Sequence, residues 1–104
     1  MRGVEMFVVI ANWPRARGEH WPLLLKARAV ENQAYVVGVN RTGEDPKLSF
    51  GGGSLVIDPY GNTIAEGGED PEVISATIDR EEVERWRTVF PVLNDIRQDL
   101  IDKK

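Results

Sequence analysis

A strand–helix–strand pattern near the start of the chain most constrains the fold. The run 4–11 (VEMFVVIA) is almost wholly apolar and rich in β-branched side chains, which is typical of a strand covered on both faces in a parallel sheet. Asn12-Trp13-Pro14 then ends it, because proline lacks the N–H that a sheet ladder needs. A helical pattern over His20–Asn32 and a strand-like run over 34–39 follow. The chain therefore predicts a right-handed β-α-β unit.

The middle of the chain predicts a loop and a hairpin. Residues 40–50 (NRTGEDPKLSF) are polar and contain glycine and proline, so we expect an exposed loop. Residues 54–57 and 62–66 flank Asp58-Pro59-Tyr60-Gly61, whose residue types are those of a type I turn, with Gly61 free to adopt positive φ. The turn predicts an antiparallel hairpin.

The last third predicts one more strand and a short helix. Residues 73–78 (VISATI) alternate in polarity as a strand does, and Asp79 is placed to cap a helix over 80–88. Residues 92–104 carry a sparse apolar pattern that needs another surface to pack on. The fold class is therefore α/β, with one crossover and without a full second layer of helices.

Composition excludes several classes of function. A chain of 104 residues is one small domain at most, and its apolar runs are far shorter than the roughly 20 residues that span a bilayer. The net charge is −4 and basic residues form no continuous stretch, so we expect neither a membrane nor a nucleic acid as partner. There is no cysteine and no signal-peptide pattern, and we expect a cytoplasmic protein.

Asn12, Trp13 and Pro14 are the candidate substrate-binding residues. They lie at the carboxyl end of a predicted parallel strand, where open α/β sheets place their ligands. The alternative is a purely structural strand end with an aromatic ring packed beneath it.

Other chemistry-bearing residues have simpler structural explanations. Glu19 and His20 are adjacent, but neighbouring residues at a helix start point about 100° apart, which disfavours an acid–base pair. Arg28 and Glu31 have the i, i+3 spacing of a surface ion pair. We expect no catalytic role for any of these four residues.

Neither a phosphate loop nor a metal site is predicted. Gly51-Gly52-Gly53 is not followed by Lys-Ser/Thr or by a helix, so close backbone approach at a strand entry is the better explanation. The acidic residues between positions 66 and 72 lack EF-hand spacing. We expect no metal and no cofactor.

Several short motifs recur in the order that one enzyme family shows. They are Asn12-Trp13-Pro14, Glu19-His20-Trp21, residues 27–33 (ARAVENQ), Tyr35-Val36, Asn40-Arg41, Phe50, Gly52, Ser54, Asp58-Pro59, Gly61, Arg87, Phe90-Pro91, Asp95 and Arg97. On these motifs the chain closely resembles the carbon–nitrogen hydrolase family (the nitrilase superfamily), especially its ω-amidase-like members. The resemblance covers nearly the whole chain.

The resemblance implies a fold and an activity. The family fold is an α-β-β-α sandwich whose members hydrolyse non-peptide C–N bonds with a Glu-Lys-Cys triad. The chain has no cysteine, and neither Lys26 nor Lys47 occupies the family's lysine position. We therefore expect residues 1–104 to be the C-terminal part of such a domain, without the segment that carries the triad. Such a part is inactive alone and contains no catalytic residue.

Three functional hypotheses follow. The first is the C-terminal segment of an amidase, whose partners are the missing N-terminal part, a second copy bound through the family's dimer helix at His20–Asn32, and a small amide once the enzyme is complete. The second is a non-catalytic dimerisation or interaction module derived from the same fold. The third, a minimal hydrolase that uses Glu19 or His20, lacks an evident nucleophile.

Overall fold

The β-α-β unit forms as predicted. The computed structural model describes residues 3–91; the predicted apolar pattern at 92–104 lies outside them. Strand β1 (Met6–Ala11) leads through the short 3₁₀ helix η1 (Arg15–Arg17) into helix α1 (His20–Asn32) and then strand β2 (Tyr35–Asn40). The two strands are parallel and in register from Met6 opposite Tyr35 to Ala11 opposite Asn40. The β2 bounds differ by one residue from the prediction.

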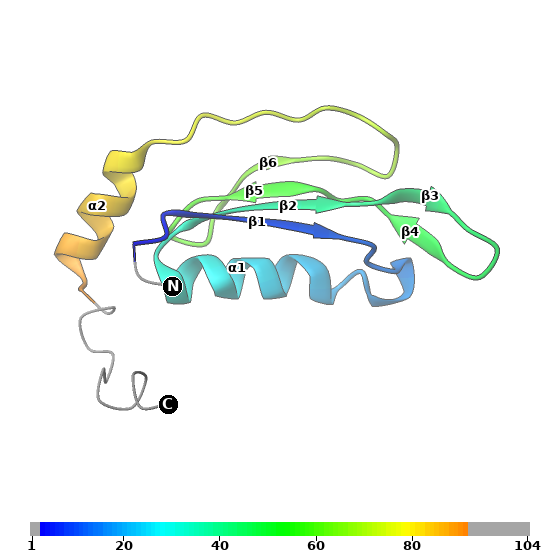
Figure 1. Ribbon diagram of the computed structural model, residues 1–104, viewed down its shortest axis with the longest axis horizontal. Coiled ribbons are helices and arrows are strands. Elements are labelled where there is room, and N and C mark those ends of the chain that lie inside the picture. The colour runs from blue at the N-terminus through cyan, green and yellow to red at the C-terminus, as the bar shows by residue number, and fades with distance from the viewer. Residues whose placement is uncertain (1–2, 92–104) are drawn as a thin grey trace.

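The remaining elements extend this sheet and add a small second one. Strands β5 and β6 join β1 and β2 in a four-stranded sheet of order β1-β2-β5-β6, and β3 and β4 pair separately. Figure 1 shows helix α2 at one end of the sheet, and the β3–β4 hairpin at the other end, toward which β1 and β2 run. The α/β class is confirmed. The bounds are Thr42–Glu44 (β3), Ser49–Gly51 (β4), Leu55–Ile57 (β5), Thr63–Glu66 (β6) and Arg80–Val89 (α2).

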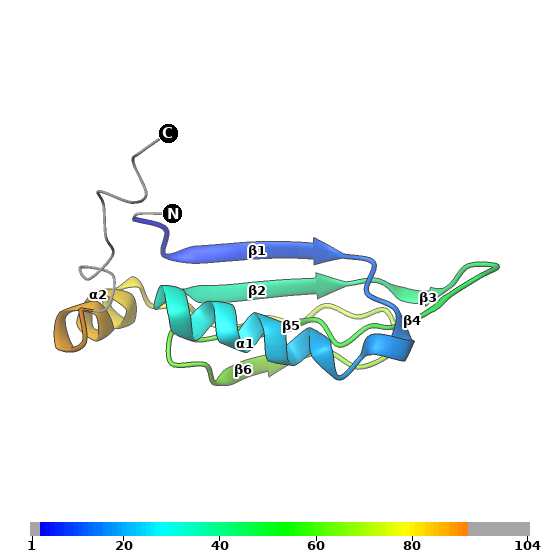
Figure 2. The same ribbon diagram turned by 90° about the horizontal axis from the view of Figure 1, so that it is seen from below.

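Helix α1 covers one face of the sheet, as Figures 1 and 2 show. Its buried residues, Trp21, Leu25 and Ala29, are four apart and therefore lie on one side of the helix. They pack on the inward-facing side chains of β2 and β5. Gly38 lets the helix approach β2, because a Cβ there would lie 2.4 Å from the Leu25 Cδ1. This interface is the main core of residues 3–91.

The structure contradicts the prediction that both faces of the first strand are covered. Exposure alternates along β1, and Phe7 and Val9 pack toward the α1 core. On the other face Met6, Val8 and Ile10 are 45%, 57% and 81% exposed. The continuous apolar run indicates that both faces of β1 can be buried. Within residues 3–91 only the face toward α1 is buried.

Residues 40–50 are not simply a loop. Thr42–Glu44 pairs antiparallel with Ser49–Gly51. The turn between them is held by the Asp45 carboxylate, which accepts hydrogen bonds from the backbone N–H of Lys47 (2.9 Å) and Leu48 (2.7 Å). β3 is polar and largely exposed, whereas β4 is half-buried around Phe50, which is 2% exposed. With a single apolar side chain between them, the two short strands lack the apolar alternation from which a half-buried strand is recognised.

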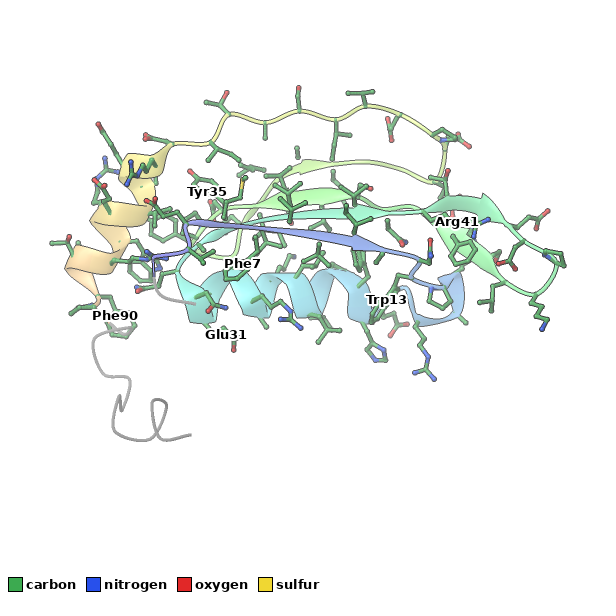
Figure 3. All side chains as sticks on the ribbon, in the orientation of Figure 1. Phe7, Trp13, Glu31, Tyr35, Arg41 and Phe90 are labelled. Atoms are coloured by element: carbon green, nitrogen blue, oxygen red, sulfur yellow. The ribbon has the colours of Figure 1, made fainter. Side chains whose placement is uncertain are left out.

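The predicted strand at 73–78 is also wrong. This stretch belongs to an extended segment, residues 67–79, which we call the strap and which pairs with no strand of the described chain. Figure 1 shows it running along the side of the sheet opposite α1. Val73 is 96% exposed while Ile74 and Ala76 are half-buried, so the alternation reflects one-sided packing without a ladder. Tyr35, labelled in Figure 3, holds its end, since the Tyr35 hydroxyl donates to the Asp79 carbonyl at 3.2 Å.

The hairpin and the second helix are confirmed. β5 and β6 pair antiparallel, and the Gly61 N–H donates to the Asp58 carbonyl at 3.0 Å, with Gly61 at φ +91°. The Asp79 carboxylate accepts from the Glu81 N–H at 2.9 Å and so caps α2.

Within residues 3–91, Arg28 and Glu31 form no ion pair. Neither helix of this part is long and apolar enough to cross a membrane.

Gln33 joins the ends of the two helices. It follows α1 in the left-handed conformation (φ 48°) and is fully buried. Its Nε2 donates to the Phe90 carbonyl at 2.6 Å, at the end of α2. The side chain thus ties α2 to the β-α-β unit.

Gly52, between β4 and β5, lies very close to the backbone of the strap. It has φ +65°, and a Cβ there would lie 2.4 Å from the Gly68 carbonyl oxygen. The neighbouring Gly53 N–H donates to the same oxygen at 3.0 Å. The predicted role of the glycine run, close backbone approach, is confirmed.

We predict that Gly52→Ala destabilises the chain more than Gly43→Ala. Gly43 also has positive φ (+79°), but a Cβ added there would meet nothing within 4 Å, so it isolates the conformational cost. We expect about 1 kcal/mol for Gly43→Ala and about 2–4 kcal/mol for Gly52→Ala, because only the latter must displace backbone. Urea unfolding measures both; equal losses would contradict the close approach.

Candidate functional site

Asn40 joins three segments at the carboxyl end of β1 and β2. Its side-chain Oδ1 accepts from the Trp13 N–H at 2.7 Å, and its Nδ2 donates to the Trp13 carbonyl at 3.2 Å. The same Nδ2 donates to the Gly52 carbonyl at 2.8 Å. The Asn40 N–H donates to the Ser54 hydroxyl at 2.9 Å. Asn40 is 6% exposed. Its side-chain amide therefore makes the hydrogen bonds that water would otherwise make to backbone groups of the loop after β1 and of the glycine run.

Two tryptophans stand beside this network. The Trp13 and Trp21 rings have centroids 5.8 Å apart and are tilted by 40°. The Trp21 indole Nε1 donates to the Gly53 carbonyl at 2.8 Å, and Trp21 is almost fully buried. Figure 3 shows Trp13 beside the start of α1. The first turn of α1 is therefore bonded to the glycine run, and the Trp13 ring packs on it.

These residues line a cleft of about 270 Å³. Its wall includes Trp13, Pro14, Trp21 and Asn40, together with the glycines at 51–53. Arg15 contributes a positive charge, forms an ion pair with Glu69 of the strap, and donates to the Phe50 carbonyl at 3.3 Å. Glu66 adds a second carboxylate to the lining. The cleft is thus bounded by η1, the strand ends and the strap.

The structure places the three predicted site residues differently. Trp13 and Pro14 line the cleft, whereas Asn12 is exposed and is absent from its wall. His20 lies in a separate apolar groove on the outer side of α1, with Leu23 and Leu24. Whether Asn12, Trp13 and Pro14 bind a substrate stays a prediction.

Sequence reasoning gave Asn40 no role. One feature of the sequence could have pointed to it: Asn40 is a polar residue directly after the apolar run 34–39. In the structure it lies opposite Ala11, at the end of the first strand. Its importance depends on which backbone groups come within reach of its amide, and those lie 27 and 12 positions away in the chain.

The cleft can bind polar groups but brings together no nucleophile and base. Its described lining offers indole rings, one guanidinium, two carboxylates and backbone groups. Within residues 3–91 no three His, Cys, Asp or Glu side chains are grouped to hold a metal ion.

Groups with shifted pKa lie away from the cleft. The hydrogen bond between the Tyr60 hydroxyl and the Glu82 carboxylate (2.9 Å) lowers the pKa of Glu82 and raises the pKa of Tyr60. Both residues belong to the end of the molecule where α2 packs, and neither lines the cleft. This pair therefore marks a structural contact between α2 and the β5–β6 turn.

Several known proteins similar to this chain are amidases. The chain is 44% identical to a 2-oxoglutaramate amidase of Bacillus subtilis over 99 residues, which are 95% of the chain and 38% of that protein. It is 39% identical to an ω-amidase of Yersinia enterocolitica, covering 88% of the chain and 36% of that protein. The chain thus spans little more than a third of the length of these relatives.

Solved structures and a family model agree with these relatives. The fold matches a carbon–nitrogen hydrolase superfamily protein of Xanthomonas campestris with a TM-score of 0.84 and 38% identity, over 89% of this chain and 36% of that one. It matches the NitFhit protein of C. elegans with a TM-score of 0.85 and 38% identity, over 95% of this chain and 24% of that one. Residues 1–88 match the carbon-nitrogen hydrolase model. The chain belongs to the carbon–nitrogen hydrolase family, the nitrilase superfamily, and is ω-amidase-like.

Proposed function

We propose that this chain is the C-terminal part of an amidase-type carbon–nitrogen hydrolase and forms part of its substrate pocket. The cleft at the carboxyl ends of β1 and β2 carries the proposal, since open α/β sheets bind ligands there. Trp13 and Pro14 supply its rim, and Asn12 precedes them at the strand end. The substrate is a small amide, as the names of the relatives suggest.

The chain is inactive by itself in this proposal. In the amidase from Nesterenkonia sp. AN1, which is 28% identical over 91% of this chain, the acetamide moiety of fluoroacetamide adds covalently to an active-site cysteine. This chain contains no cysteine. A nucleophile must therefore come from the portion of the enzyme that these residues do not include.

The exposed face of β1 supports a docking site for that portion. Met6, Val8 and Ile10 form an apolar row on the face away from α1, and β1 is the edge of the four-stranded sheet as described. An exposed apolar strand at a sheet edge favours association with further structure. In the sandwich expected from the family resemblance, a second sheet packs on this face.

We predict that activity returns when the chain is combined with the missing portion. The test co-expresses it with the part of the Bacillus subtilis 2-oxoglutaramate amidase that it does not match, and measures ammonia release from small amides, 2-oxoglutaramate included. We expect hydrolysis by the pair and background rates for either part alone. An assembled but inactive pair would contradict the proposal.

Two variants sharpen this test. Replacing the nucleophilic cysteine of the added part by alanine should abolish the signal, which excludes a contaminating amidase. Ile10→Glu should lower the yield of the pair about tenfold, because a carboxylate would be buried without a partner. Val89→Glu, in α2 at the end of the sheet and 72% exposed, serves as the matched control and should leave assembly unchanged.

The second candidate function is an interaction module that associates through α1. Leu23, Leu24 and Val30 are exposed on this helix, and the groove of about 270 Å³ beside Leu23 and Leu24 is mainly apolar. A second copy of the chain is the proposed partner at His20–Asn32.

The cytoplasmic location and the lack of nucleic acid and membrane partners stay predictions.

We predict that the isolated chain self-associates. Leu24→Glu should raise the dissociation constant of this association about tenfold, because the substitution places a charge in an apolar contact. Sedimentation velocity over a concentration series measures the dissociation constant. Lys26→Glu, on the same helix, controls for added negative charge. A wild-type chain that stays monomeric throughout the series would contradict association through α1.

A further inference from the structure

We infer that Asn40 is the residue that positions Trp13 for ligand binding in the cleft; the inference rests on the proposed function. Trp13 lies just beyond β1, outside the sheet ladder, yet both of its backbone polar groups are bonded to the Asn40 side chain. This two-point contact fixes the peptide plane on either side of Trp13. It therefore fixes the direction in which the indole leaves the backbone.

The same amide also bonds the glycine run, which lines the cleft too. Asn40 Nδ2 also donates to the Gly52 carbonyl, and Gly53 is bonded to the Trp21 indole. The Trp13 ring packs on Trp21 at 5.8 Å. One side chain thus links the Trp13 backbone to the glycine run, while the Trp13 indole Nε1 donates to the Arg17 carbonyl at 2.5 Å and holds the far end of the ring.

Only an amide makes all of these bonds. One acceptor faces the Trp13 N–H, and two N–H donors face two carbonyls. In Asn40→Asp the shape is preserved, but an ionised carboxylate would face the Trp13 and Gly52 carbonyl oxygens without a proton to donate. Protonation of the introduced carboxyl group restores one of the two hydrogen-bond donors. The variant should therefore regain part of the native geometry at acid pH.

The spectroscopic test uses the chain as it is. Near-ultraviolet circular dichroism reports the coupling between the Trp13 and Trp21 rings, and Trp13→Phe identifies the part of the signal that they share. We expect Asn40→Asp to lose this signal at neutral pH and to regain part of it on acidification. Arg15, Glu66 and Glu69 line the same cleft, Arg17 and His20 line a groove together with Trp13, and Arg41 follows Asn40. The wild-type pH series is therefore subtracted.

Asn32→Asp is the matched control, because Asn32 ends α1, at the end away from Trp21, and its amide donates to the Arg28 carbonyl of the same helix. It should leave the signal unchanged at every pH. In the wild type, hydrogen exchange followed by NMR should show a protected Trp13 N–H, a measurement that does not depend on whether any variant folds. An unprotected Trp13 N–H, or an unchanged tryptophan signal in Asn40→Asp, would overturn the inference.

The functional test uses the two-part enzyme. We expect Asn40→Asp to raise KM about tenfold while kcat changes less than about twofold, since loss of the buried hydrogen bonds disturbs binding and leaves the chemical groups in place. An equal fall in kcat with unchanged KM would overturn the role in ligand binding. If the wild-type pair is inactive, the proposed function fails, and the spectroscopic test still decides whether Asn40 holds Trp13.

Discussion

The hydrogen bonds of the Asn40 amide are the constraint on which the cleft depends. Parallel strands β1 and β2 end side by side, and each leaves backbone groups that the ladder no longer pairs. A buried amide with one acceptor and two donors satisfies both backbone polar groups of Trp13, just after β1, and the Gly52 carbonyl of the glycine run. Because unpaired buried polar groups are costly, the loop after β1 and the glycine run converge on Asn40.

The core beneath this site is built from close approaches. Trp21, Leu25 and Ala29 lie on one side of α1 and meet β2 where Gly38 leaves room for them. Gly52, in the connection between β4 and β5, likewise leaves room for the strap at Gly68. Small residues at these two positions bring a helix and an extended segment within contact of the sheet, so the cleft forms between elements that are already held together.

The uncovered face of β1 connects the fold to the proposed function. Residues 3–91 bury one face of this strand and leave an apolar row on the other. The chain also spans little more than a third of the length of the amidases it resembles. Both observations support a domain of which this chain supplies a pocket wall, with the nucleophile supplied by the rest.

The sequence by itself determined the local structure. Apolar periodicity and turn residues predicted β1, α1, β2, the β5–β6 hairpin and α2, because these depend on neighbouring residues. It also predicted the family, from motifs spread along the chain. The β3–β4 hairpin escaped it, since two three-residue strands with one apolar side chain, Phe50, show no apolar alternation.

Only the tertiary structure decided which predicted surfaces are buried and which polar groups meet. It left one face of β1 exposed and the strap unpaired, because burial depends on what lies opposite a segment in space. It also placed the buried Asn40 in the wall of the cleft. Its partners at Trp13 and Gly52 are distant in the chain, and only folding brings them within hydrogen-bonding distance.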